Sequence, residues 1–75
     1  MAAAIYSDIR EKRGILREIY GGMMSLADLS RELGMSPEDA KVWASSQGIG
    51  TIIGRRIKYE TDMVAKIIVV QRGMC

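Results

Sequence analysis

Apolar residues in the middle of this chain recur with helical spacing in two short runs. Leucines stand at i, i+3 and i+7 across residues 26–33, and Gly34 follows where a helix commonly ends. A second apolar face, which includes Trp43, extends across residues 37–47. A serine, one of the preferred helix N-caps, directly precedes each run. The pattern predicts two helices joined by a short turn, as in a helix-turn-helix; a plain corner between two helices has the same pattern.

The residues that follow favour strands. Residues 51–53 and 57–59 are rich in Ile, Thr and Tyr, and they flank Gly54, Arg55 and Arg56. We predict a β-hairpin with both arginines at its tip, where neutral turn residues are more usual.

Hydrophobic residues of the hairpin are expected to attach it to a core that includes Leu33 and Trp43. Trp43 is predicted to be a core residue rather than a platform for a stacked base, because alanines share its helical face. The attaching residues are expected to be Ile53, Ile57 and Tyr59.

The N-terminal residues also follow helical spacing. Residues 3–20 form an amphipathic pattern that Gly14 weakens, and such a helix packs as a lid on the helix-turn-helix and hairpin or forms a dimer face. The basic pair Lys12 and Arg13 is interpreted as a solvated face.

The C-terminal residues 62–71 are predicted to form a further helix. Residues 67–70 are all β-branched, which leaves a strand open as an alternative. The apolar surface at the two ends indicates self-association through the N-terminal helix or the C-terminal apolar segment.

One hydrophobic core must serve all of these elements in a chain of 75 residues. We therefore predict a single domain over residues 1–75, mainly α with a small β-hairpin. Its parts are an N-terminal helix (3–20), a helix-turn-helix with the hairpin (24–60) and a C-terminal helix (61–72).

The charge is spread unevenly, which matters more than the net charge of +2. Residues 48–75 contain five basic and two acidic residues, whereas residues 25–47 contain two basic and four acidic residues. A positive C-terminal third indicates an anionic partner.

Residue types that most enzymes and metal sites need are absent or isolated. The sequence has no histidine, and its single cysteine, Cys75, is the last residue. We therefore expect no catalytic activity, metal, cofactor or small-molecule substrate. The apolar run at residues 67–70 is too short to span a bilayer, and the N-terminus has no apolar stretch of signal-peptide length. The expected location is a bacterial cytoplasm, with no membrane partner.

Together these motifs resemble the small excisionase-like members of the mercury-resistance-regulator (MerR-like) winged-helix superfamily. The resemblance covers residues 24–68, and its hairpin motif is the more specific part. It departs from the family pattern at Val42, where a polar or basic residue is common, and at Glu38 and Asp39, where Ser or Thr is common. The matching residues are Gly34-Met35-Ser36 at the turn, Trp43 in the second helix and Ile53-Gly54-Arg55-Arg56-Ile57-Lys58-Tyr59 in the hairpin.

The resemblance implies a winged helix-turn-helix protein of a phage or mobile element that binds double-stranded DNA without catalysis, in DNA recombination or transcription regulation. In a bacterial host such a protein would be associated with the nucleoid. Helix 37–47 would enter the major groove, and the 52–59 wing would contact the backbone or the minor groove. The residues expected to contact DNA are Arg55, Arg56, Lys58, Lys41, Ser45 and Glu38.

Glu38 has two interpretations. It accepts a hydrogen bond from a cytosine amino group, or it is a solvated acid that the helix dipole favours. Two other functions also remain open. One is a dimeric transcriptional regulator of the same fold, and the other is a protein-interaction adaptor or anti-repressor that uses the acidic helix 37–47.

Overall fold

The computed structural model describes residues 2–72, with side chains from Ile5 onward. The prediction of a mainly helical chain with a small antiparallel β-structure is confirmed. Cys75 lies outside the described residues. The described elements are α1 (Ala2–Tyr20), β1 (Met23–Met24), α2 (Leu26–Leu33), α3 (Pro37–Ser46), β2 (Thr51–Ile53), β3 (Arg56–Glu60) and α4 (Thr61–Arg72).

Capping residues set the bounds of α2 and α3. Ser25 Oγ accepts a hydrogen bond from the backbone N–H of Asp28 at 3.1 Å, and Asp28 Oδ2 accepts from the N–H of Ser25 at 3.2 Å. Gly34 ends α2 with φ +69°, a left-handed conformation that suits glycine. Ser36 caps α3 by accepting from the N–H of Asp39 at 3.2 Å. Both helices were predicted from sequence, and α3 ends one residue earlier than expected.

The sheet contains a strand that the sequence analysis did not predict. The strand order is β1-β3-β2, and both pairs are antiparallel. Met23 pairs with Glu60 and Met24 pairs with Tyr59. A strand of two residues is too short to show a twofold hydrophobic period, so its formation depends on the partner strand that tertiary folding brings alongside.

The hairpin turn is tighter than predicted. Ile53 pairs with Arg56, so that only Gly54 and Arg55 form the turn. Gly54 has φ +63° and Arg55 has no positive φ, as in a type II′ turn, whose twist suits a two-residue hairpin. The prediction of both arginines at the tip is therefore wrong for Arg56, which is the first residue of β3.

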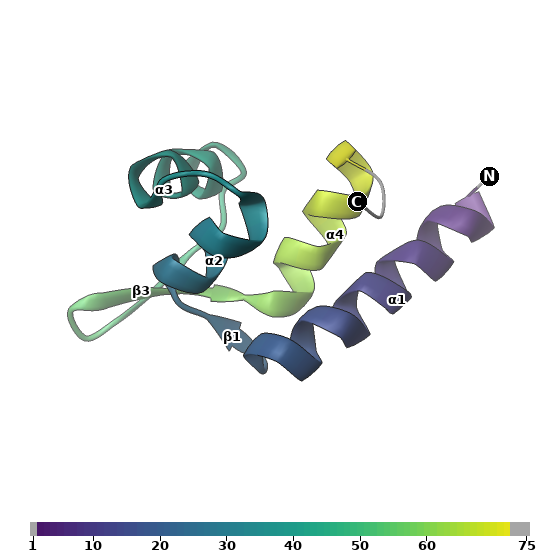
Figure 1. Cartoon of the computed structure of the whole chain (residues 1–75), viewed down its shortest axis with the longest axis horizontal. Coiled ribbons are helices and arrows are strands. Elements are labelled where there is room, and N and C mark those ends of the chain that lie inside the picture. Colours follow the sequence, from purple (N-terminus) through teal and green to yellow (C-terminus); the bar gives the residue numbers. More distant parts are fainter. Residues whose placement is uncertain (1, 73–75) are drawn as a thin grey trace.

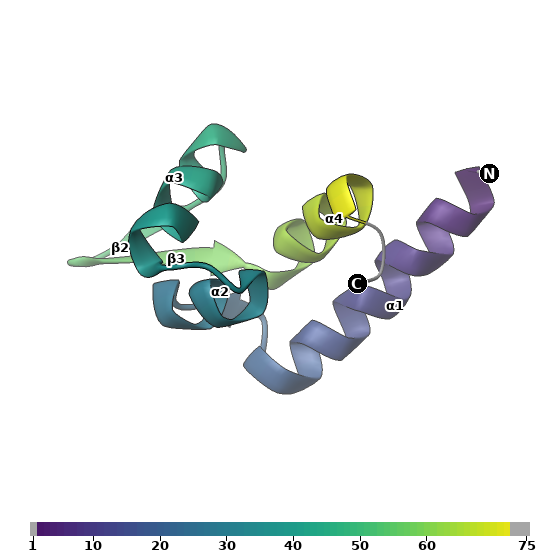
Figure 2. The same ribbon diagram turned by 45° about the horizontal axis from the view of Figure 1, so that its top comes forward.

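The two end helices pack against each other at one end of the molecule, and α2 and α3 lie over the sheet at the other end (Figures 1 and 2). Residues 67–70 are helical, which excludes the alternative strand. α1 runs antiparallel along α4 rather than lying as a lid over α2 and α3. No helix within residues 2–72 is both long and apolar enough to cross a bilayer.

A single buried cluster joins the two ends. Every helix and two strands contribute to it, and Tyr59 is among its largest fully buried side chains. Thr61, the first residue of α4, is also fully buried, and its hydroxyl donates to the carbonyl of Gly21 at 2.7 Å. The cluster consists of Leu16, Met24, Leu29, Leu33, Ala40, Ala44, Tyr59, Val64, Ala65 and Ile68.

Lys12 contradicts the interpretation of Lys12 and Arg13 as a solvated pair. Lys12 is only 9% exposed, and its Nζ lies 3.2 Å from Glu32 Oε2. The other Glu32 oxygen accepts from the Tyr20 hydroxyl at 3.1 Å. Glu32 of α2 therefore holds two side chains of α1, whereas Arg13 is exposed as predicted.

Two tyrosines are expected to lower the free energy of unfolding at alkaline pH. Burial raises the pKa of Tyr59 above the ordinary value of 10.0, and burial together with the hydrogen bond to Glu32 raises the pKa of Tyr20. The folded state thus holds these protons more tightly than the unfolded chain, so this contribution is complete below about pH 10 and is lost as the pH rises through the folded pKa values.

We expect the free energy of unfolding, measured by urea denaturation, to fall as the pH rises above about 10. The fall should be smaller in Tyr59→Phe. Tyr6→Phe, which changes an exposed phenol, is the control and should leave the fall unchanged. A fall of equal size in Tyr59→Phe and the parent protein would exclude this role for Tyr59.

Candidate nucleic-acid interface

The face of α3 that is turned away from the core is exposed and chemically mixed. α3 buries Ala40 and Ala44 on its inner face. All of the α3 residues predicted to contact DNA are exposed, and they share one helical face with Val42, which is 68% exposed. This α3 face consists of Glu38, Lys41, Val42 and Ser45.

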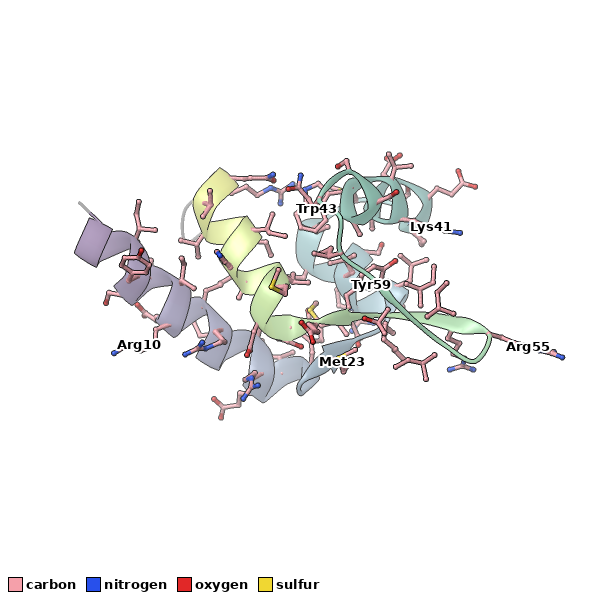
Figure 3. All side chains as sticks on the ribbon, turned by 180° about the vertical axis from the view of Figure 1, so that it is seen from behind. Arg10, Met23, Lys41, Trp43, Arg55 and Tyr59 are labelled. Carbon is pink, nitrogen blue, oxygen red and sulfur yellow. The ribbon has the colours of Figure 1, made fainter. Side chains whose placement is uncertain are left out.

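Two cationic side chains, one from the hairpin turn and one from α3, lie at the same end of the molecule. Arg55 occupies the turn and projects from the tip, and Lys41 extends from α3 toward the same end of the molecule (Figure 3). Arg55 and Arg56 are both exposed. Among residues 2–72, neither arginine takes part in an ion pair, so their charges are available to a partner.

Lys58 and Arg56 are placed differently from the predicted contact residues of α3. Side chains alternate along β3, so Arg56 and Lys58 point to one face of the hairpin, whereas Ile57 and Tyr59 point to the other. Tyr59 is fully buried and Ile57 packs against the core. Lys58 is half-buried on the face opposite these residues. The structure therefore brings Lys41, Ser45 and Arg55 to one end, whereas the side chains of Arg56 and Lys58 lie on the hairpin face that is turned away from α3.

The attachment of the hairpin differs from the prediction at Ile53. Ile57 and Tyr59 contact the core as expected, but Ile53 is 54% exposed. Its pairing with Arg56 places it at the last position before the turn, on the hairpin face that does not carry Tyr59. Of the three residues predicted to attach the hairpin to the core, only the two in β3 do so.

Trp43 lies where the sequence analysis expected it, against the core and not on the exposed face of α3. It is partly buried, and its Nε1 donates to Gln71 Oε1 at 3.2 Å. At the same end of α4, Arg72 Nη1 donates to the carbonyl of Leu33 at 3.2 Å. These contacts tie α4 to α2 and α3 and fix the orientation of α3 relative to the rest of the fold.

A groove separates α3 from the hairpin. Its volume is about 230 Å³, and its wall on the hairpin side is apolar. In Figure 3, Tyr59 lies between the hairpin and α3 at the base of this region. The groove is lined by Lys41, Ala44, Ser45, Ile49, Gly50, Ile52, Ile57 and Tyr59.

Sequence reasoning missed two exposed apolar residues at this end. Ile52 is 77% exposed and Val42 is 68% exposed. The adjacent pair Ile52 and Ile53 contained a usable signal, because neighbouring residues of a strand point to opposite faces and a short hairpin has a core on one face only. At least one exposed isoleucine was therefore predictable.

The arrangement can bind an anionic surface, since hairpin residues 51–59 carry three basic and no acidic side chains. Within residues 2–72, no three Asp, Glu or Cys side chains gather closely enough to hold a metal ion. Comparison of the chain with protein-family models, with curated proteins and with solved structures found no match.

Proposed function

We propose that this chain is a small DNA-binding protein of the winged helix-turn-helix type, with an architectural or regulatory role such as that of excisionase-like proteins. In this proposal α2 and α3 are the helix-turn-helix and the β2–β3 hairpin is the wing. The observation that carries it is the exposed, unpaired Arg55 at the hairpin tip, at the same end of the molecule as the exposed face of α3.

The exposed face of α3 enters the major groove, where Lys41 and Ser45 reach a base edge or the backbone. Arg55 and Arg56 then contact the flanking phosphates or the adjacent minor groove. Each phosphate that a basic side chain neutralises releases counterions, so binding must weaken as salt rises. With about three or four cations in contact, the logarithm of affinity should fall with the logarithm of salt with a slope of about −3 to −4.

The double variant Arg55→Ala/Arg56→Ala tests the proposal. We expect its affinity for a random DNA duplex, measured by fluorescence anisotropy at low salt, to fall at least about tenfold and its salt slope to become shallower by about 2. Arg10→Ala/Arg13→Ala is the matched control, because it removes the same charge from exposed residues of α1 at the other end of the molecule. Equal losses in both variants would show that binding is not localised at the hairpin.

A protein-interaction adaptor is the second candidate, and a specific observation favours it. Val42 is 68% exposed beside Glu38, and Asp39 is also exposed, so one end of α3 combines apolar and acidic surface. Acidic side chains at this position repel phosphates. If the parent protein binds no duplex even at low salt, the DNA proposal is wrong and the adaptor becomes the better interpretation.

A further inference from the structure

The groove between α3 and the hairpin has two chemically different walls. On the α3 side, Lys41 and Ser45 stand one helical turn apart. On the hairpin side, Ile52 and Ile57 are cross-strand partners and present carbon atoms only. With a volume of about 230 Å³, the groove is smaller than the pockets of about 300–1,000 Å³ that hold drug-sized ligands.

The apolar wall is open to solvent at its outer end. Ile52 is 77% exposed, although Ile57 beside it is partly buried against the core. At the inner end the backbone closes the groove, since a Cβ on Gly50 would lie 3.4 Å from both Ile57 Cγ2 and Tyr59 Cε1. The groove is therefore an open channel with a closed floor.

The charge of the channel favours an anionic partner. No acidic residue lines it, Lys41 stands on one wall, and Arg55 is at the end of the hairpin. A nucleic-acid strand offers the complementary alternation, because phosphates carry the charge and the carbon faces of the deoxyribose rings are apolar. An extended peptide has a neutral backbone, which would pair with the edge strand β2, and it carries negative charge only where its side chains are acidic.

We propose that this groove holds one deoxyribose-phosphate strand of a DNA duplex, with the sugars packed on Ile52 and Ile57 and a phosphate bound by Lys41 Nζ and Ser45 Oγ. The proposal rests on the DNA-binding function proposed above and adds to it a contact that does not depend on charge. The strand between the two grooves of the duplex lies in the channel, while α3 and Arg55 occupy the grooves on either side.

Salt titrations distinguish the proposed apolar contact with the sugars from a contact between a cation and a phosphate. Removing a cation from phosphate contact changes the salt slope by about 1, whereas removing apolar contact lowers affinity by the same factor at every salt concentration. Ile52→Ser removes the apolar contact and leaves the charge unchanged. Because Ile52 is mostly exposed, the variant should fold, which far-UV circular dichroism verifies.

We expect Ile52→Ser to bind a random duplex about five- to tenfold more weakly than the parent protein between about 50 and 200 mM salt, with an unchanged slope. Lys41→Gln should instead make the salt slope shallower by about 1. Ile19→Ser, which changes an isoleucine that is 63% exposed on α1, is the matched control and should bind like the parent.

The outcomes separate this inference from the function on which it rests. If the parent protein binds no duplex, both proposals are wrong. If the parent binds and Arg55→Ala/Arg56→Ala weakens binding, but Ile52→Ser binds like the parent, the strand is not in the groove and only this inference is overturned. If sedimentation velocity shows a parent dimer that Ile52→Ser dissociates while DNA affinity stays unchanged, a second copy occupies the groove and the inference is also overturned.

Discussion

Leu29→Ala is expected to lower the free energy of unfolding by about 3 to 4 kcal/mol, since it leaves a cavity at a fully buried position of the only core cluster described. A domain of this size has a total stability of about 4–11 kcal/mol, so the variant should unfold at much lower urea concentration or be partly unfolded in water. Urea denaturation followed by Trp43 fluorescence or circular dichroism measures the change.

Ile19→Ala provides the matched control for Leu29→Ala. Both variants shorten an aliphatic side chain on a helix, but Ile19 is 63% exposed, so its loss should cost no more than about 0.5 kcal/mol. A cost for Leu29→Ala below about 1 kcal/mol would mean that α2 does not pack at the centre of the core as described.

Glu32→Ala is expected to have the second largest effect. It removes the acceptor of both Lys12 and Tyr20, and it leaves the Lys12 ammonium, whose side chain is 11% exposed, without its partner. Removing one partner of a fully buried pair costs about 3–5 kcal/mol; because Glu32 retains 18% exposure, we expect about 2 kcal/mol.

Arg31→Ala is the control for this prediction, because it breaks the exposed ion pair of Arg31 with Asp28, at 3.8 Å, on the same helix. That loss should be below about 0.5 kcal/mol in urea denaturation. The double variant Lys12→Met/Glu32→Leu should regain most of the stability lost in Glu32→Ala, since no charge is then left buried without a partner. If Glu32→Ala and Arg31→Ala unfold at the same urea concentration, Glu32 does not hold α1 to α2.

These two predictions bear on the proposed DNA interface. The α3 face and the hairpin tip are exposed and contribute little to the core, so their orientation depends on α2, Tyr59 and the contacts of α4 with α2 and α3. Leu29→Ala should therefore weaken DNA binding only through unfolding, whereas Arg55→Ala/Arg56→Ala should weaken it in a fully folded protein. Measuring both properties on the same variants separates the two effects.

The features of this fold that depend on near neighbours in the chain were predictable from the amino-acid pattern. Leucine spacing and the Ser25 cap specify α2, and the apolar face with Trp43 and the Ser36 cap specifies α3, because helix periodicity and capping act within about one or two turns. Gly54 between two β-rich segments specifies the hairpin for a similar reason, although the register that places Arg56 in β3 was not predicted. The exposure of Arg55 followed from its place in the turn.

Contacts between residues far apart in the chain set which surfaces meet, and no local pattern predicted them. β1 exists because the chain returns to place Met24 beside Tyr59, and Lys12 is buried because Glu32, twenty residues away, supplies a counter-charge. The β-branched residues 67–70 are helical because α1 covers one side of α4, so burial outweighs their intrinsic strand preference. The groove beside Ile52 likewise requires α3 and the hairpin to be oriented by distant contacts, which no local pattern encodes.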